Sequence, residues 1–275
     1  MNEPSPVASV RSLRGEEAFV YGLKERAKQN HCLAYGTFSV EMERLESLRK
    51  EYSRAIAPIT NVALFLKAAA LAVERNPQVN AILFRGWLAP RIVQFRNVDV
   101  NLPITRQLGD RWITFIGTVR SAPTKSLVAI QRELTQYQRC RPEESQSIRR
   151  VLWFDGKPLW LARLVHFWMG RSPTFYIKNV GTCGLTIGAG HHEYSFPIAP
   201  TSAVFGLGGA AREPVVRGDS IAIARVMRCS LMIDNFVVPG LVAERLIHDF
   251  RALLESASFA EEELRAVRSR QAVAS

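Results

Sequence analysis

The chain lacks long apolar runs, a signal-peptide core and closely spaced cysteines. Because no uncharged apolar run reaches about 18 residues, we expect no membrane-spanning helix. The N-terminal residues contain no apolar stretch of the kind found in secretory signals. The cysteines form no CxxC pair, which argues against a metal site and, in a cytoplasmic protein, against disulfides; they are Cys32, Cys140, Cys183 and Cys229. We therefore expect a soluble, cytoplasmic protein without a bound metal.

Charge of one sign is in excess, with a formal net charge of +11 and a pI near 10.0. One interpretation is attraction for an anionic partner, such as coenzyme A or an acidic carrier protein. The other is that arginines are spread over a solvated surface. The basic residues are dispersed, and no motif typical of nucleic-acid binding is present, so we expect no nucleic-acid partner.

The hydrophobic share of 47% is sufficient for a large core. We expect a flexible lead over 1–14, one domain over 15–257, and a C-terminal helix and tail over 258–275. Periodicity and capping signals predict helices over 15–30, 41–54, 60–75, 126–139, 241–256 and 260–269. Strands are predicted over 32–40, 79–83, 90–98, 112–119, 173–180, 202–207 and 220–233. Residues 206–209 are predicted to form a tight turn.

Residues 151–172 form an aromatic-rich insert that holds three of the five tryptophans. It could cap a substrate pocket, bind a partner, lie on a membrane surface, or bury its own rings. Charges and a proline interrupt the membrane pattern. We favour a substrate-side cap in which Trp168 contacts an apolar substrate, because the insert precedes the segment that ends at Asn179.

The most informative segment runs from Asp234 to Gly240, between a strand and an amphipathic helix. It resembles the Asp-His-Arg-x-x-Asp-Gly motif of the catalytic domain of 2-oxoacid dehydrogenase (dihydrolipoyl) acyltransferases, in the chloramphenicol acetyltransferase-like superfamily. Asn235 stands where that family has histidine, and Pro239 where it has aspartate. Residues 77–81 and 179–181 resemble the family's P-x-x-N-A and N-l-G segments. The resemblance covers about residues 30–257.

This resemblance implies a fold, an assembly and a reaction. The fold is a two-layer α/β domain with a mixed sheet covered by helices, and the assembly is a homotrimer with sites between subunits. In the family, a histidine takes a proton from the acyl acceptor, which attacks a thioester, and a hydroxyl near the N-l-G turn stabilises the oxyanion. We expect a stand-alone domain, since no lipoyl domain precedes it.

Asn235 cannot take a proton near neutral pH, although its carboxamide can orient a substrate beside Asp234. For the oxyanion donor, motif position indicates Thr182 or Asn179, and Thr186 less strongly. Cys183 is either an acyl-accepting thiolate or a small buried residue, and we favour the second interpretation.

His191 and His192 are either a relocated base or a solvent-exposed pair in a loop. The first hypothesis is an acyltransferase-derived enzyme of specialised metabolism that uses an acyl-coenzyme A or carrier-bound thioester, with chemistry redirected toward cyclisation or elimination. No covalently bound cofactor is expected. The alternative is a non-catalytic binding or scaffold subunit that keeps the trimer.

Overall fold

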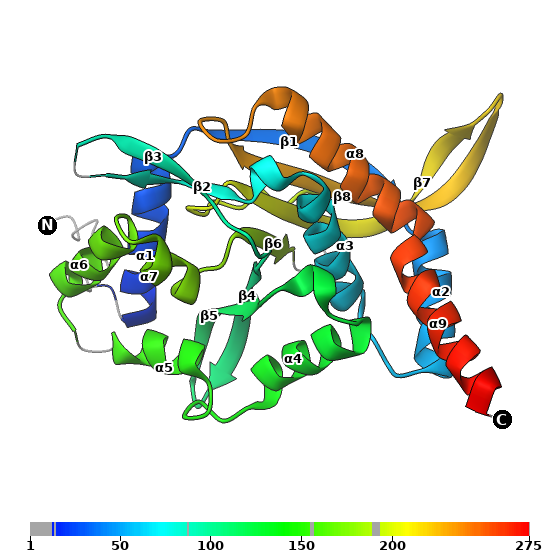
Figure 1. Cartoon of the computed structure of the whole chain (residues 1–275), viewed down its shortest axis with the longest axis horizontal. Helices are drawn as coiled ribbons and strands as arrows, with labels where there is room; N and C mark the ends of the chain where they lie inside the picture. Colours follow the sequence, from blue (N-terminus) through cyan, green and yellow to red (C-terminus); the bar gives the residue numbers. More distant parts are fainter. Residues whose placement is uncertain (1–12, 14, 87, 155–156, 189–192, 275) are drawn as a thin grey trace, which may run out of the picture.

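The computed structural model describes residue 13 and residues 15–274, except 87, 155–156 and 189–192. A mixed six-stranded sheet is its centre (Figure 1), with strand order β1-β8-β7-β6-β4-β5. β6 pairs in parallel with β4 and β7, and the other pairs are antiparallel. The strands are β1 (Leu33–Glu41), β4 (Val100–Leu108), β5 (Arg111–Val119), β6 (Cys183–Ile187), β7 (Ala203–Arg217) and β8 (Ser220–Asp234). A separate hairpin joins β2 (Ala81–Arg85) to β3 (Pro90–Gln94).

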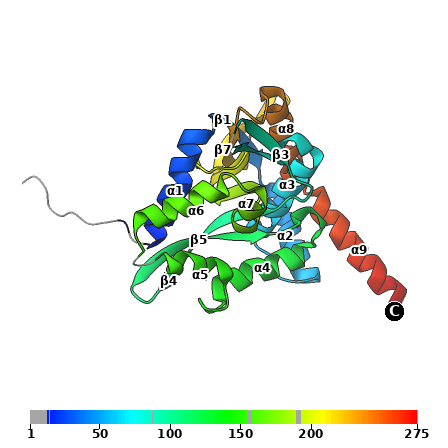
Figure 2. The ribbon, with the colours of Figure 1, turned by 60° about the vertical axis from the view of Figure 1, so that its left-hand side comes forward.

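Helices cover the sheet and pack around its ends (Figures 1 and 2). They are α1 (Gly15–Asn30), α2 (Glu43–Ala55), α3 (Asn61–Arg75), α4 (Leu127–Arg139), α5 (Gln146–Trp153), α6 (Leu159–Met169), α7 (Pro173–Asn179), α8 (Gly240–Ser256) and α9 (Ser258–Ala274). Two 3₁₀ turns, Pro77–Val79 and Ala122–Thr124, complete the order. The expected layering of a mixed sheet with covering helices is therefore confirmed.

The main core forms where α3 and α8 pack on the sheet. The α3 sequence is apolar on nearly every face, because the helix also packs against α4 and against α8. The helix ends at Asn76, since Pro77 has no backbone N–H with which to continue it. Thr60 occupies the N-cap position, but its hydroxyl donates to Gln131 Oε1 instead of capping the helix.

One strand prediction was wrong, and two strands, β4 and β6, were not predicted. Residues 173–179 form helix α7 instead of a strand, because Pro173 fits the first turn and the Ser172 hydroxyl caps it by accepting from the N–H of Phe175. Strand β4 was missed, since Pro103 interrupts its pattern. The structure accommodates Pro103 within an antiparallel pair with β5, where it lies opposite Ile116.

The predicted turn at 206–209 is also wrong, because these residues lie inside β7, where its pairing register shifts between Leu207 and Ala210. A Cβ atom at Gly206 would lie 2.1 Å from the carbonyl oxygen of Ser195. One at Gly208 would lie 2.1 Å from that of Glu193. The glycines therefore let the segment before β7 approach its backbone closely.

The β7–β8 hairpin projects beyond the sheet (Figure 1). Apolar side chains near its tip are exposed, namely Val216, Ile221 and Ile223. The aromatic-rich insert forms the end of α5 and all of α6. Its tryptophans do not bury their rings, since Trp153, Trp160 and Trp168 are each at least half exposed. None of the described helices is both long and apolar enough to cross a bilayer.

Candidate functional site

A buried histidine lies beside the acidic residue of the 234–240 loop. Nδ1 of His31, just before β1, is 2.6 Å from Oδ2 of Asp234 at the end of β8. Neither side chain has exposed surface. The contact arises because β1 and β8 pair antiparallel, which brings the start of one to the end of the other. His31 Nε2 is buried and has no hydrogen-bond partner within the described structure.

Asp234 also organises the loop that follows it. Its Oδ1 accepts hydrogen bonds from the backbone N–H groups of Cys32 and Phe236, at 3.0 and 3.1 Å. Its backbone carbonyl accepts from the N–H groups of Val237 and Val238. The N–H of Asn235 donates to the carbonyl of Cys32 at 2.7 Å. A single carboxylate thus fixes the backbone and leaves the Asn235 side chain exposed.

Pro239 fits the helix that the loop leads into. It takes the N-cap position of α8 with an extended backbone, and its carbonyl accepts from the N–H of Val242. The position needs no N–H donor, so proline is compatible with the helix start.

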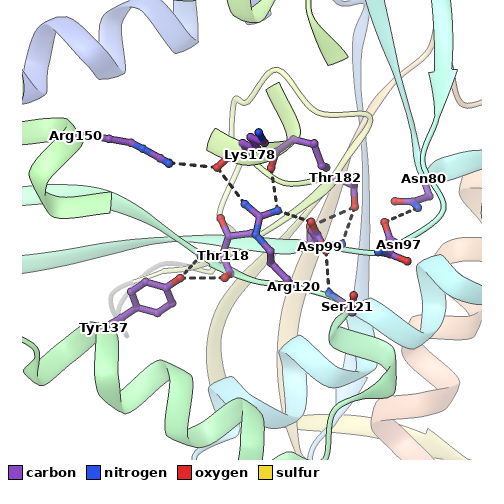
Figure 3. A network of polar contacts seen from close by, with 11 residues as sticks. Asn80, Asn97, Asp99, Thr118, Arg120, Ser121, Tyr137, Arg150, Lys178 and Thr182 are labelled. Carbon is purple, nitrogen blue, oxygen red and sulfur yellow. Dashed lines mark hydrogen bonds and ion pairs between the residues drawn. The ribbon is translucent and has the colours of Figure 1, made fainter. Parts of the chain in front are cut away.

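The residues near the predicted oxyanion site form a different network (Figure 3). Thr182 is fully buried. Its Oγ1 accepts from the N–H of Asp99 at 2.9 Å, and its own N–H donates to the Asp99 carbonyl at 2.8 Å. In this conformation the Thr182 hydroxyl ties β6 to the segment that enters β4, and it has no surface that a substrate can reach.

Asp99 is the centre of this network. Its carboxylate accepts from Arg120 Nη1 at 2.7 Å and from the N–H of Ser121 at 2.8 Å. Arg120 also donates to the carbonyls of Ile177 and Lys178 at the end of α7 (Figure 3). A cation at a helix C-terminus satisfies carbonyls that have no partner within the helix. The network therefore anchors α7 to the sheet.

The other predicted site residues are more scattered. Asn179 ends α7 and lines a pocket of about 440 Å³ with Arg120 and Arg150. Burial raises the pKa of Cys183 to about 12, and the nearby Asp99 adds to the rise, so its thiol is neutral at physiological pH. This finding favours the small buried residue over the acyl-accepting thiolate. Thr186 lies in β6, beside Gly206 of β7. Trp168 is half exposed and meets Phe167 edge to face.

His191 and His192 lie outside the described residues, so their role as a relocated base stays a prediction. Across the described part of the chain, no group of three or more His, Cys, Asp or Glu residues could hold a metal ion.

Thr182 and Asp234 lie at the same end of the strands of the sheet. Gly184 of β6 pairs with Val204 of β7, which pairs with Met232 of β8. The backbones of Thr182 and Asp234 are therefore about 10 Å apart, which is two strand spacings. Sequence reasoning missed His31, Asp99 and Arg120, because no local pattern marks them. Their partners become visible once strand pairing is known.

The family model for the 2-oxoacid dehydrogenases acyltransferase (catalytic domain) matches residues 23–147 and 171–260. The acetyltransferase component of the Zymomonas mobilis pyruvate dehydrogenase complex is 27% identical over 241 residues, covering 83% of this chain and 46% of that protein. The mitochondrial succinyltransferase component of the human 2-oxoglutarate dehydrogenase complex is 23% identical over 235 residues, covering 82% and 45%. The chain thus spans about half the length of these relatives.

Solved structures show the same fold. The dihydrolipoamide acetyltransferase of Azotobacter vinelandii superposes with a TM-score of 0.68 at 17% identity, covering 94% of this chain and 99% of that one. A probable dihydrolipoamide acetyltransferase from Listeria monocytogenes gives 0.65 at 20% identity, covering 90% and 94%. The family model does not match residues 148–170, which include all of α6.

Proposed function

Because the chain belongs to the 2-oxoacid dehydrogenase acyltransferase (catalytic domain) family, we propose that it binds an acyl thioester at the 234–240 loop. The observation that carries this proposal is the intact loop. Asp234 holds it through His31 and two backbone N–H groups, and Asn235 projects from it. A carboxamide both donates and accepts hydrogen bonds, so Asn235 orients the thioester without acting as a base.

The chemistry at this loop follows from what asparagine can do. In acyl transfer, an acceptor thiol or hydroxyl attacks the thioester carbonyl, the C–S bond breaks, and the proton of the acceptor ends on the departing thiol. Without a positioned base this step is slower by about a hundredfold or more. Cyclisation or elimination of a bound thioester depends more on confinement and hydrogen bonding. We therefore propose redirected chemistry of this kind, in an enzyme of specialised metabolism.

The thioester donor is acyl-coenzyme A or an acyl group on a carrier protein. Both carry negative charge, and the net charge of +11 attracts either. We further propose a homotrimer. The exposed apolar side chains at the β7–β8 tip, including Ile221 and Ile223, are suited to contacts between subunits.

A second function is favoured by one observation. The imidazole next to the loop, that of His31, has no exposed surface, so it does not reach a bound substrate in this conformation. The alternative is accordingly a non-catalytic binding or scaffold subunit.

Restoring the family pair separates the two functions. Asn235→His with Pro239→Asp is compared with the parent, using acetyl-coenzyme A as donor, dihydrolipoamide as acceptor and release of free coenzyme A as the signal. We expect the double variant to exceed the parent by about a hundredfold. Pro239→Asp alone is the control and is expected to gain little, since it places no imidazole at position 235.

Binding is measured in parallel by calorimetry with acetyl-coenzyme A. If neither protein binds it and the double variant gains no turnover, the scaffold function replaces the enzyme.

A further inference from the structure

A second pocket, of about 370 Å³, lies between α1 and α6. The two helices pack against each other and cross at a large angle in both views (Figures 1 and 2). Three arginines line the pocket (Arg26, Arg163 and Arg171), together with one carboxylate, that of Glu25. The pocket therefore has an excess of positive charge.

Arg26 is the unusual member of this group. It is 5% exposed, and its Nε and Nη1 atoms are buried and donate to no acceptor among the described residues. Its Cζ lies 5.1 Å from the ring centre of Tyr176 and 5.8 Å from that of Phe84. Burial lowers the pKa of Arg26. Ring contacts offset part of the cost of burying a guanidinium, but unused N–H donors remain unfavourable.

Among the residues that the structure describes, none is hydrogen-bonded to these two Arg26 atoms. Glu25 Oε1 accepts from the Tyr21 hydroxyl and lies 3.6 Å from Arg163 Nη2. The Tyr176 hydroxyl donates to the carbonyl of Pro200 at 2.7 Å. Charged side chains are rarely buried without a partner. Arg26 lines the pocket, so the pocket is where an acceptor from outside the chain can approach its guanidinium.

One wall of the pocket lies outside the residues that the family model matches. Helix α6 falls within residues 148–170, which the family model does not match. Its close packing against α1 depends on Gly22, where a Cβ atom would lie 2.1 Å from His166 Cδ2. The cavity beside Arg26 is therefore bounded by one helix inside the matched region for part of its length, α1, and by one helix outside it, α6.

We propose that the pocket between α1 and α6 binds an oxyanion, the carboxylate or phosphate group of a small molecule, with the Arg26 guanidinium as its main contact. A planar guanidinium matches the paired oxygens of either group. Leu83 and Phe167 provide apolar surface in the same pocket for a short hydrocarbon body.

Calorimetric titration of the full chain with sodium phosphate and with sodium butyrate tests the proposal, at constant ionic strength set with sodium chloride. Phosphate binding with weak butyrate binding identifies a phosphate ligand, and the reverse identifies a carboxylate ligand. We expect Arg26→Met to weaken the tighter of the two at least tenfold, because it removes the donors and keeps an unbranched apolar stem. Arg26→Gln gives the same comparison should the methionine variant not fold.

Arg163→Gln is the matched control, since it removes one positive charge from the same pocket at a half-exposed side chain. We expect it to change affinity less than threefold. The ligand-free melting temperature of Arg26→Met should equal or exceed that of the parent, because a buried charge without hydrogen-bond acceptors is removed. The proposal is overturned if neither anion binds the parent, if Arg163→Gln weakens binding as much as Arg26→Met and Arg26→Gln do, or if both Arg26 variants bind like the parent.

Discussion

The His31 imidazole and the Asp234 carboxylate meet at 2.6 Å, although 203 residues separate them in sequence. This contact joins the entry of β1 to the exit of β8, which is where the 234–240 loop begins. The loop therefore depends on a side chain from the opposite end of the chain. An imidazole from elsewhere in the chain thus lies beside the aspartate that opens the 234–240 loop.

Removing the Asp234 carboxylate should destabilise the protein. Asp234→Ala leaves His31 and the N–H groups of Cys32 and Phe236 buried without their acceptor. We expect the free energy of unfolding in urea to fall by about 3–5 kcal/mol. Asp219→Ala, at an exposed carboxylate in the β7–β8 turn, should change it by less than about 0.5 kcal/mol. Equal effects of the two substitutions would show that the buried pair contributes no particular stability.

The elements with strong patterns could be predicted from sequence. The apolar helix α3 and the long strand β8 follow from periodicity, and Pro77 marks where α3 ends. Helix α7 could not be predicted, because its Thr-Phe-Tyr-Ile run favours a strand. The Ser172 cap and Pro173 at the first turn make this segment a helix instead.

The 234–240 loop of the candidate site could be predicted from the sequence, but the residues that surround the site could not. The position of Asp234 between a strand and a helix follows from local sequence. The partner of Thr182 does not, because Asp99 reaches it through the pairing of β4 with β6, and such non-local pairing leaves no trace in a short window.

A side chain at Gly206 should disturb β7. Gly206→Ala places a Cβ 2.1 Å from the Ser195 carbonyl oxygen and 2.4 Å from Ser230 Oγ, so the backbone must shift. We expect a loss of about 1–3 kcal/mol in the free energy of unfolding. The control is Gly240→Ala, at a helix start where a Cβ meets nothing within 4 Å, and it should stay within about 0.5 kcal/mol. If Gly206→Ala leaves the free energy of unfolding unchanged, the segment before β7 can shift to accommodate the Cβ atom at no cost.

Stability should fall in alkaline solution. Burial raises the pKa of Cys183 to about 12, whereas an unfolded cysteine ionises near about 8.5. Between these values the unfolded state binds fewer protons than the folded state, so each rise of one pH unit costs about 1.4 kcal/mol for this group. The thiol of Cys229 and the hydroxyls of Tyr52 and Tyr176 act in the same direction, because burial raises the pKa of each.

Urea unfolding of the parent and of Cys183→Ala between pH 7.5 and about pH 10 measures this dependence. We expect the slope of the variant to be smaller by about one proton above pH 9. Val204→Ala shortens a buried side chain without removing a titrating group, so it should lower stability and keep the parent slope. Identical slopes for the parent and Cys183→Ala would place that thiol in contact with solvent.

Substitutions at the exposed tip of the β7–β8 hairpin test the proposed homotrimer. Ile221 and Ile223 are 77% and 67% exposed, on a hairpin that projects from the sheet (Figure 1). In the proposed trimer these side chains are buried against a neighbour, and two charges there would be desolvated without partners. We expect the parent to sediment as three chains at micromolar concentration, and Ile221→Lys with Ile223→Lys to sediment as one. Trp160→Lys adds a charge at an exposed aromatic side chain on α6 and should keep the parent mass. A parent that sediments as a single chain would contradict the trimer, and a double variant that stays trimeric would move the interface away from this hairpin.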